Sequence, residues 1–577
     1  MTDLLSGPAR PIIVLLLGAL ALGLLDRLTH PRDQGILSVV LLADGFVALL
    51  SLRPRLPLHV ILGRWHDSPL LGCCWGIGVD GLAFLFAAAL FFVTLALGLT
   101  TVGRRPTPRV PLLVLLAAAL GFIFAGDLIT MSASSFLLDL AFAWTVIATG
   151  NTSRQQVESP SQASEEIPSP RSERRPRPAP WAVGLGGLTS LTLLAAALTL
   201  SLEGKFPSLD MALSSPRALL LVTVAILLRL GTYPLHFWLP LEVETPPVTR
   251  AWLHLIPAMA GLWLPTRAYT LALGPWPWPS FFLTLGSIAF LVAAFLAWGE
   301  SQRERVLSWA ILAQLGYALV LSTLGTPPAP IALNLLLGAG LLFIGPLFAT
   351  SWRSTSRRWG RWQWVVEIPT AMGVALLAGM PGTLGLPGRT ALYRALLAQG
   401  PLSLLALCLL AESLLVAALL HAWLTPGSNA PPEAQNSRPS LTSWSTLIAA
   451  LLLTSVALLV SIHPPLLARL FPGVISLPSL LTQFGGITLA QAAAIVLPLV
   501  AGLALHRYRV EIGAQIAGYW EAVSPVLRLE WLTRALSAPW SLGCELLRAT
   551  GEIGVGQGYL GWVFLAGLLA VLFVLTR

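Results

Sequence analysis

Long apolar runs separated by short polar loops recur along the chain from Pro11 almost to Arg577. A helix of roughly 20 apolar residues is long enough to cross the hydrocarbon core of a bilayer. We therefore predict an all-α, polytopic membrane protein with about sixteen transmembrane helices. The predicted spans are 11–25, 35–52, 80–102, 109–125, 127–149, 181–202, 216–240, 247–273, 279–298, 306–324, 330–350, 364–398, 401–424, 442–462, 486–505 and 557–576.

Two of these spans carry helix-breaking residues beside an arginine. Arg229 is followed by Gly231 and Pro234, and Arg389 is preceded by Gly385 and further glycines. Proline removes a backbone donor and glycine weakens a helix, so carbonyl groups are freed at membrane depth. Such groups are tolerated only against protein or a hydrated cavity. Both helices are predicted to break near a buried cation.

The broken helices occupy matching places in the chain. Each is the fourth of five predicted helices, a pattern that indicates an inverted-repeat transporter. We predict the following division: N-terminal helices over 1–108, a first repeat over 109–273, a second inverted repeat over 279–424, C-terminal helices over 425–505, an amphipathic lateral segment over 506–556 and a last helix over 557–577.

Two polar segments interrupt the apolar pattern. Residues 151–180 are rich in Ser, Pro, Gln, Glu and Arg, so a disordered cytoplasmic loop is predicted there. Between 506 and 556, apolar residues such as Ile516 and Trp520 recur at near-helical spacing among charges. This spacing fits an amphipathic helix lying along a membrane or a neighbouring subunit, or an ordinary cytoplasmic hairpin.

Composition and charge support the membrane assignment. The chain is 55% hydrophobic and 11% charged, which excludes an ordinary soluble globular domain. Its net charge of +9 lies in loops rather than on one soluble face. The positive-inside rule then predicts that both termini lie outside. We expect the membrane to be a prokaryotic plasma membrane, and we expect the first apolar run to be retained as a helix. The four cysteines show no metal-ligand spacing, so no metal or cofactor site is predicted.

Ionisable residues inside the spans are the candidate functional groups. A charge at the bilayer centre costs roughly 2.5–3.5 kcal/mol, so each must have a partner or a role. Three of them, Arg267, Arg394 and His421, lie close enough to helix ends to reach the interface. The predicted proton path or charge axis consists of Asp139, Arg229, His236, His254, Arg389 and Glu412.

We predict that Asp139 pairs with Arg229 and that Glu412 pairs with Arg389. The sequence leaves two interpretations of these pairs open, because a static pair that fixes helix packing fits as well as a functional one. His254 is open in the same way. It could relay protons near neutral pH, or it could be satisfied by a backbone carbonyl.

Several local sequences carry a family resemblance. They are Val79-Asp80-Gly81-Leu82, Pro234-Leu235-His236-Phe237-Trp238-Leu239-Pro240 followed by Pro247-Val248-Thr249, Arg305-Val306-Leu307-Ser308-Trp309 leading to Gln314-Leu315-Gly316-Tyr317, and Ala378-Gly379-Met380-Pro381 through Gly385 to Arg389. Over roughly residues 75–425 the chain resembles the antiporter-like proton-channel subunits of respiratory complex I (NADH-quinone oxidoreductase, chains of the L, M and N type) and the Mrp cation/proton antiporters.

The resemblance implies two inverted five-helix repeats, each a half-channel, joined by a central chain of protonatable lysines and histidines. The family's cations on the two broken helices fall on Arg229 and Arg389. An arginine holds its charge but does not release a proton in a working cycle. The chain has a single lysine, Lys205, so composition bias accounts for part of this replacement.

Other family positions depart further. The gating glutamate falls on Phe136, with Asp139 one turn later as a substitute. The next helix has His254 beside the expected position, and the central histidine and lysine positions fall on the apolar Gly338 and Leu342.

These patterns predict a membrane subunit of a complex I-type ion-translocating oxidoreductase that moves protons along a midplane polar axis. Two alternatives stay open: a non-conducting structural subunit of such a complex, and an Mrp-type Na⁺/H⁺ antiporter subunit. Redox chemistry would belong to partner subunits, because the sequence shows no dinucleotide-binding, nucleotide-binding or zinc motif. Expected partners are other membrane subunits, lipid, and protons or Na⁺, and no nucleic acid.

Overall fold

The computed structural model describes residues 7–25, 30–65, 73–103, 108–157, 178–238, 245–271, 278–324, 329–356, 364–424, 441–471 and 486–529, with positions 531, 532, 535 and 545. The chain divides into two units, one formed by 1–167 and 178–515 and the other by 168–177 and 516–577. The predicted last span, 557–576, lies outside the described residues, as does most of the predicted amphipathic segment beyond α21 (Arg509–Leu527).

The first unit begins with two helices and a hairpin. The elements in this part are α2 (Arg10–Leu25), α3 (Pro31–Leu50), the 3₁₀ turn η1 (Arg53–Arg55), β1 (Leu58–Trp65), β2 (Cys73–Val79) and α4 (Gly81–Leu99). The antiparallel strands pair Leu58 with Val79, so the expectation of a purely helical fold is corrected over this segment. In β1, β-branched residues such as Val60 and Ile61 favour extended backbone.

Two groups of five helices form the rest of the core. The first comprises α5 (Arg109–Ile123), α6 (Leu128–Val157), α7 (Pro178–Leu202), α9 (Pro216–Leu230) and α10 (Pro247–Leu271), with the short α8 (Leu209–Ser214) and η3 (His236–Trp238) beside α9. The second comprises α11 (Pro279–Gly299), α12 (Arg303–Thr323), α13 (Ala329–Ser356), the broken helix α14 (Ile368–Leu377) and α15 (Leu386–Gln399), and α16 (Leu402–Leu424). The unit then continues through α17 (Leu441–Ile462), α18 (Pro465–Leu470) and α20 (Leu489–Arg507).

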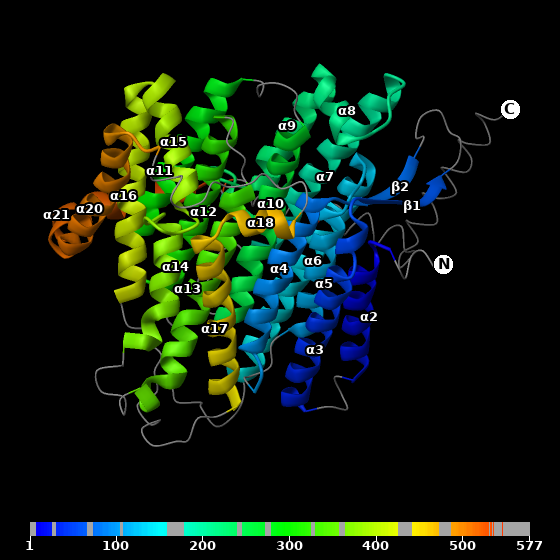
Figure 1. Ribbon diagram of the computed structural model, residues 1–577, viewed down its shortest axis with the longest axis horizontal. Coiled ribbons are helices and arrows are strands. Elements are labelled where there is room, and N and C mark those ends of the chain that lie inside the picture. The colour runs from blue at the N-terminus through cyan, green and yellow to red at the C-terminus, as the bar shows by residue number, and fades with distance from the viewer. Residues whose placement is uncertain are drawn as a thin grey trace. The chain divides into compact units, whose positions relative to one another are not determined.

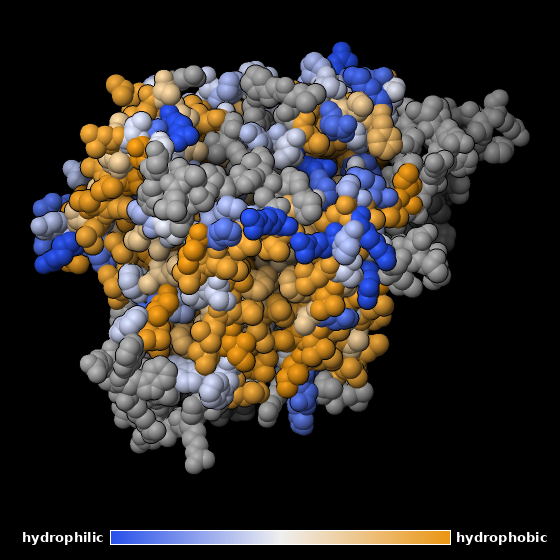
Figure 2. All heavy atoms as spheres, in the orientation of Figure 1, coloured by the Kyte–Doolittle hydropathy of each residue, from blue (hydrophilic) through white to orange (hydrophobic). Residues whose placement is uncertain are grey.

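The helices of the first unit run alongside one another, with the blue and cyan helices of the first half on one flank and the yellow-green helices of the second half on the other (Figure 1). Between them lie α10 and α12, which contact each other, and α10 also contacts α5 and α9. Hydrophobic side chains gather over the lower middle of the visible face (Figure 2), where α4 and α17 lie in Figure 1. Among the described residues, ten helices are long and apolar enough to cross a membrane. The fold is that of a multi-pass membrane protein.

Both predicted helix breaks are present. Helix α9 ends at Leu230, and Gly231 adopts a left-handed backbone with a φ of 55°. The predicted span 364–398 is divided between α14 and α15, and Gly379 and Gly382 in the connection have positive φ values of 55° and 84°. Only glycine adopts such backbone readily, so these residues set where each helix stops. One boundary needs correction, because α6 continues to Val157, into the predicted loop 151–180.

Candidate functional site

The first ion pair joins α6 to the end of α9. An Nη1–H of Arg229 donates to Oδ1 of Asp139 at 2.7 Å, and the two side chains are only 5% and 11% exposed. The Arg229 guanidinium also lies over the ring of Phe122, 5.2 Å from its centroid. Arg229 reaches this place because α9 breaks two residues later. The pairing predicted from the sequence is present.

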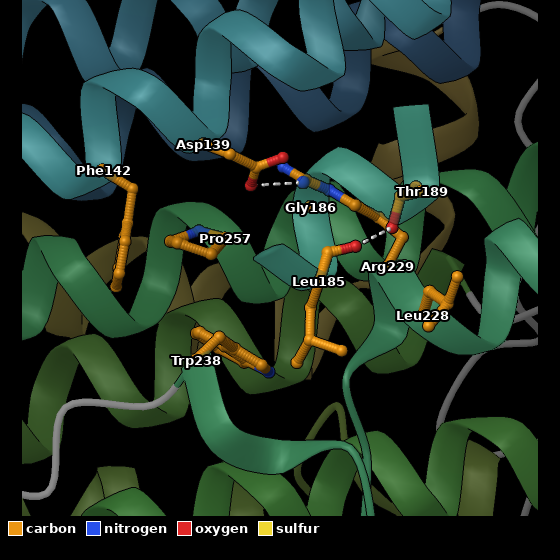
Figure 3. Close-up of a pocket in the computed structure, with 9 residues that line it drawn as sticks. All are labelled: Asp139, Phe142, Leu185, Gly186, Thr189, Leu228, Arg229, Trp238 and Pro257. Atoms are coloured by element: carbon orange, nitrogen blue, oxygen red, sulfur yellow. Dashed lines mark hydrogen bonds and ion pairs between the residues drawn. The ribbon is translucent and has the colours of Figure 1, made fainter. Parts of the chain in front are cut away.

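A glycine lets the carboxylate of Asp139 lie directly against α7. A Cβ atom added at Gly186 would overlap the carboxylate, whereas one added at the neighbouring Gly187 would meet nothing within 4 Å. Figure 3 shows the Asp139 side chain beside the backbone at Gly186, with Arg229 reaching across from α9. The close approach of α6 and α7 at Gly186 therefore positions the acid.

A small cavity adjoins this pair (Figure 3). Its volume is about 30 Å³, and its lining includes Asp139, Arg229, Thr189, Trp238 and Pro257. Within the described residues, Oδ2 of Asp139 and Nε and Nη2 of Arg229 make no hydrogen bond. A cavity above roughly 10–15 Å³ with polar partners admits a water molecule. The pair therefore borders a space in which water can be hydrogen-bonded.

The second pair joins α15 to α16. Arg389, on the first turn of α15, forms an ion pair with Glu412 of α16, and the hydroxyl of Tyr393 donates to the same carboxylate. Arg389 is 4% exposed and Glu412 is completely buried. This pairing, too, agrees with the sequence prediction. Arg389 gives the buried carboxylate an opposite charge and Tyr393 gives it a hydrogen-bond donor, as a buried charge requires.

The carbonyl groups freed by the α14–α15 break are bonded by side chains. The carbonyl of Leu377 accepts from Gln314 at 3.0 Å and from Arg389 at 3.1 Å. The carbonyl of Leu376 accepts from Asn334 at 3.0 Å. The interruption at membrane depth is thus satisfied by protein groups, as the physical rule requires.

Helix α12 connects the middle of the molecule to the second pair. Its Ser308 hydroxyl lies 2.8 Å from Nε2 of His254, whose Nδ1 lies 2.7 Å from the carbonyl oxygen of Arg250. About 9 Å further along α12, six residues at 1.5 Å each, stands Gln314 at the α14 break. His236 lies beside the same helix, its ring 5.1 Å from that of Trp309.

His254 is thus held by a backbone carbonyl, as one sequence interpretation had it, and at the same time by a hydroxyl. Four polar residues near the axis were not singled out from the sequence as site residues: Ser308, Gln314, Asn334 and Tyr393. Their signal was present, because a polar side chain in the middle of an apolar span needs a buried partner.

The positions Gly338 and Leu342 are closed by packing. A Cβ at Gly338 would approach the Leu377 side chain to 2.8 Å, and one at Gly373 would approach the Gly338 carbonyl to 2.8 Å. Leu342 is completely buried, and its carbonyl accepts from Arg303 at 3.1 Å. Helices α13 and α14 therefore touch closely where a longer relay side chain would have to fit.

The remaining candidates lie outside this axis. Arg267 forms an ion pair with Asp80 and lies 5.9 Å from the Trp263 ring. Arg394 is exposed on α15, and His421 faces His506 at 6.4 Å between ring centroids. Among the described residues, no group of three or more His, Cys, Asp or Glu side chains is placed to hold a metal ion.

Sequence comparison places residues 181–416 in the family described as NADH:quinone oxidoreductase/Mrp antiporter, transmembrane. A protein of Rhizobium meliloti named as a probable K⁺/H⁺ antiporter component is 26% identical over 54% of this chain and 31% of its own length. The NADH-ubiquinone oxidoreductase chain 2 of Formosania lacustris is 23% identical over 45% of this chain and 75% of its own length. The chain spans about a third of the length of the first of these relatives.

Solved structures share the fold across nearly the whole chain. A chain of the Mrp complex from Dietzia sp. superposes with a TM-score of 0.69 at 17% identity, covering 99% of this chain and 63% of that one. A chain of the membrane-bound sulfane sulfur reductase, an archaeal respiratory membrane complex, gives 0.66 at 17%, covering 98% and 99%. The family match spans Arg229, His254, Arg389 and Glu412. Residues 181–416 therefore match the family of complex I antiporter-like subunits and Mrp antiporter subunits.

Proposed function

We propose that the chain is an ion-translocating, antiporter-like subunit of a membrane complex of the complex I, Mrp or sulfane sulfur reductase kind, and that it moves protons along the polar axis between its two buried pairs. One observation carries the proposal. Each five-helix group contains a buried acid–arginine pair beside a broken helix, and both pairs are held by residues from separate helices. Buried charges are costly, so two paired arginines, each at the break of the fourth helix of its group, favour a shared role in transport.

The proposed carriers follow from the chemistry of each group. Arg229 and Arg389 keep their charge, so they modulate the field at Asp139 and Glu412 rather than pass protons on. Protons would move through the carboxylates, through His254 with Ser308, and through water at the first pair. The 30 Å³ cavity supports the last step, because it borders the free oxygen of Asp139.

A second candidate is a structural subunit that no longer conducts. The close packing of Gly338 and Leu342 favours it, because these positions offer no titratable side chain between the two halves. In this case the two pairs would only fix the helices that carry them. Two separate polar contacts along α12, His254 with Ser308 and Gln314 with the Leu377 carbonyl, favour conduction instead.

The transported ion distinguishes a third candidate. One relative, from Alkalihalophilus pseudofirmus, is named as part of a Na⁺/H⁺ antiporter and is 27% identical over 25% of this chain and 18% of its own length. An Mrp-type subunit would couple protons to Na⁺ or K⁺, so its proton flux would depend on the alkali cation. A flux that is the same in choline, Na⁺ and K⁺ buffers would favour a pure proton path.

The proposed setting is a prokaryotic plasma membrane, with both termini outside and with other membrane subunits as partners. The arginine-rich loops support this orientation, because positive residues concentrate on the cytoplasmic side. The division into two inverted repeats and the lateral segment 506–556 belong to the same proposal.

Proton flux in proteoliposomes that contain the purified parent complex tests the proposal. Asp139→Ala, Arg229→Ala and Glu412→Ala are compared with wild type under an identical driving reaction, with Arg394→Ala, an exposed arginine of α15, as the matched control. We expect at least about a tenfold fall in flux for the first three, equivalent to about 1.4 kcal/mol, and little change for the control. Unchanged flux in assembled variants would favour the structural subunit.

A further inference from the structure

The outer face of α3 carries a carboxylate in the middle of an apolar span. Asp44 is the central residue of the candidate membrane span Asp33–Arg55, which consists of most of α3, the turn after Leu50 and η1. It is exposed, and so are Val40 and Val47, one turn to each side, at 55% and 60%. The opposite face packs inward, because a Cβ at Gly45 would lie 2.9 Å from the Phe91 ring.

This position is unfavourable for a charge that faces lipid. An aspartate at the centre of a spanning helix lowers the insertion equilibrium by roughly a hundredfold. Along the helix, Asp44 lies about 9 Å from Leu50, where α3 ends, and about 16 Å from Asp33, both farther than a short aspartate side chain reaches. No hydrogen bond or ion pair joins Asp44 to the part of the chain that the structure describes.

We infer that the face of α3 formed by Val40, Asp44 and Val47 docks a membrane-spanning helix of a different subunit, one that presents a lysine or arginine at the depth of Asp44. Charge complementarity selects this occupant, since an apolar helix would leave the carboxylate unpaired. The chain's own predicted span 557–576 has no basic residue between Tyr559 and Thr576. A second copy packed face to face would bring another Asp44.

The inference rests on the proposed membership of a multisubunit complex, and it is independent of whether the chain conducts. Exposed apolar residues alone would not carry it, because lipid covers such residues as well as a partner does. Because Asp44 lies within the span, the partner helix must carry a cation that pairs with it. The amount of that subunit in the purified complex must then depend on Asp44.

Asp44→Leu is the decisive variant. Leucine is favourable in lipid, so this variant keeps the chain stable whichever way the face points. If Asp44 is paired, Asp44→Leu lowers the amount of the partner subunit that purifies with the chain by at least tenfold. Leu451→Val, a change on the exposed side of α17 outside this face, leaves that amount unchanged. If Asp44 faces lipid, Asp44→Leu assembles like wild type, and the inference is wrong.

Crosslinking in the intact parent complex identifies the occupant. A photoreactive amino acid replaces Val47, with Leu451 on α17, which is 60% exposed, as the comparison site. We expect a crosslink from position 47 to one subunit whose reacting segment contains a lysine or arginine. Replacing that cation by aspartate together with Asp44→Lys should restore co-purification. Crosslinks only to lipid, to a second copy of the chain, or to a segment without a cation would overturn the inference.

A chain that purifies without any other subunit would overturn both this inference and the proposed membership of a complex. An intact complex in which position 47 reaches only lipid would overturn the inference alone, because assembly would then depend on other faces. The two failures are therefore distinguishable in one preparation.

Discussion

Gly186→Ala should disturb the first ion pair without removing either charge. The added methyl group would occupy the place of the Asp139 carboxylate, which must then turn away from its 2.7 Å contact with Arg229. Overpacking of a tight site costs about 1–3 kcal/mol. Complete loss of the contact would approach the roughly 3–5 kcal/mol of a broken buried pair. We expect Gly186→Ala to lower the free energy of unfolding by about 1–3 kcal/mol, because the Asp139 carboxylate can rotate toward the adjoining cavity.

Gly187→Ala is the matched control on the same helix. Its added Cβ meets nothing within 4 Å, and alanine in place of glycine favours a helix by about 0.5–1 kcal/mol. The free energy of unfolding in mixed detergent–SDS micelles measures both variants, and proton flux in proteoliposomes follows the function. If the lost energy appears in the transport barrier, Gly186→Ala lowers flux by roughly 5- to 150-fold. Equal stability and flux in the two variants would refute the argument that Gly186 positions Asp139.

Three further predictions follow from the same geometry. Asp139→Ala and Arg229→Ala should each lower the free energy of unfolding by about 3–5 kcal/mol. The double variant, Asp139→Leu with Arg229→Met, should recover most of that stability but none of the flux. Equal losses of stability in the single and double variants would contradict a buried pair. Tyr393→Phe removes the hydroxyl that donates to the buried Glu412 carboxylate and should cost about 1–3 kcal/mol in the same unfolding assay. Tyr317→Phe should cost little, because the Tyr317 hydroxyl makes no hydrogen bond in the described chain. Lys205 is the single lysine, and its side chain is 39% exposed. A membrane-impermeant amine reagent should label Lys205 from outside intact cells, as measured by mass spectrometry of the peptide that contains it, and Lys205→Arg should abolish this label. Labelling only after lysis would reverse the proposed orientation.

Much of the candidate site could be predicted because membrane burial makes charge conspicuous. Asp139, Arg229, Arg389 and Glu412 stand in apolar runs where a charge is costly, so each required a partner, and both predicted pairs are present. Asp44 satisfies the same sequence criterion, yet it was not selected. Its importance depends on the face of α3 to which it belongs, which becomes clear only when Gly45 is seen packed inward.

The neutral polar residues of the axis were harder to predict. Gln314 and Asn334 are inexpensive enough in a helix to stand there for many reasons, and their role depends on carbonyls from α14 that lie 42 residues or more away in the chain. Long-range hydrogen bonds of this kind arise from the packing of α12 and α13 against the break. A linear sequence contains no information about that distance by itself.

The sequence by itself determined the class of the protein, the existence of its spans and the two helix breaks, because hydropathy, glycine and proline act locally. Tertiary structure decided the hairpin over 58–79, the closure of Gly338 against α14 and the joining of His254 to Ser308. Each of these depends on how closely two helices or strands approach. That approach is set by the packing of many side chains together, and so it is readable only in three dimensions.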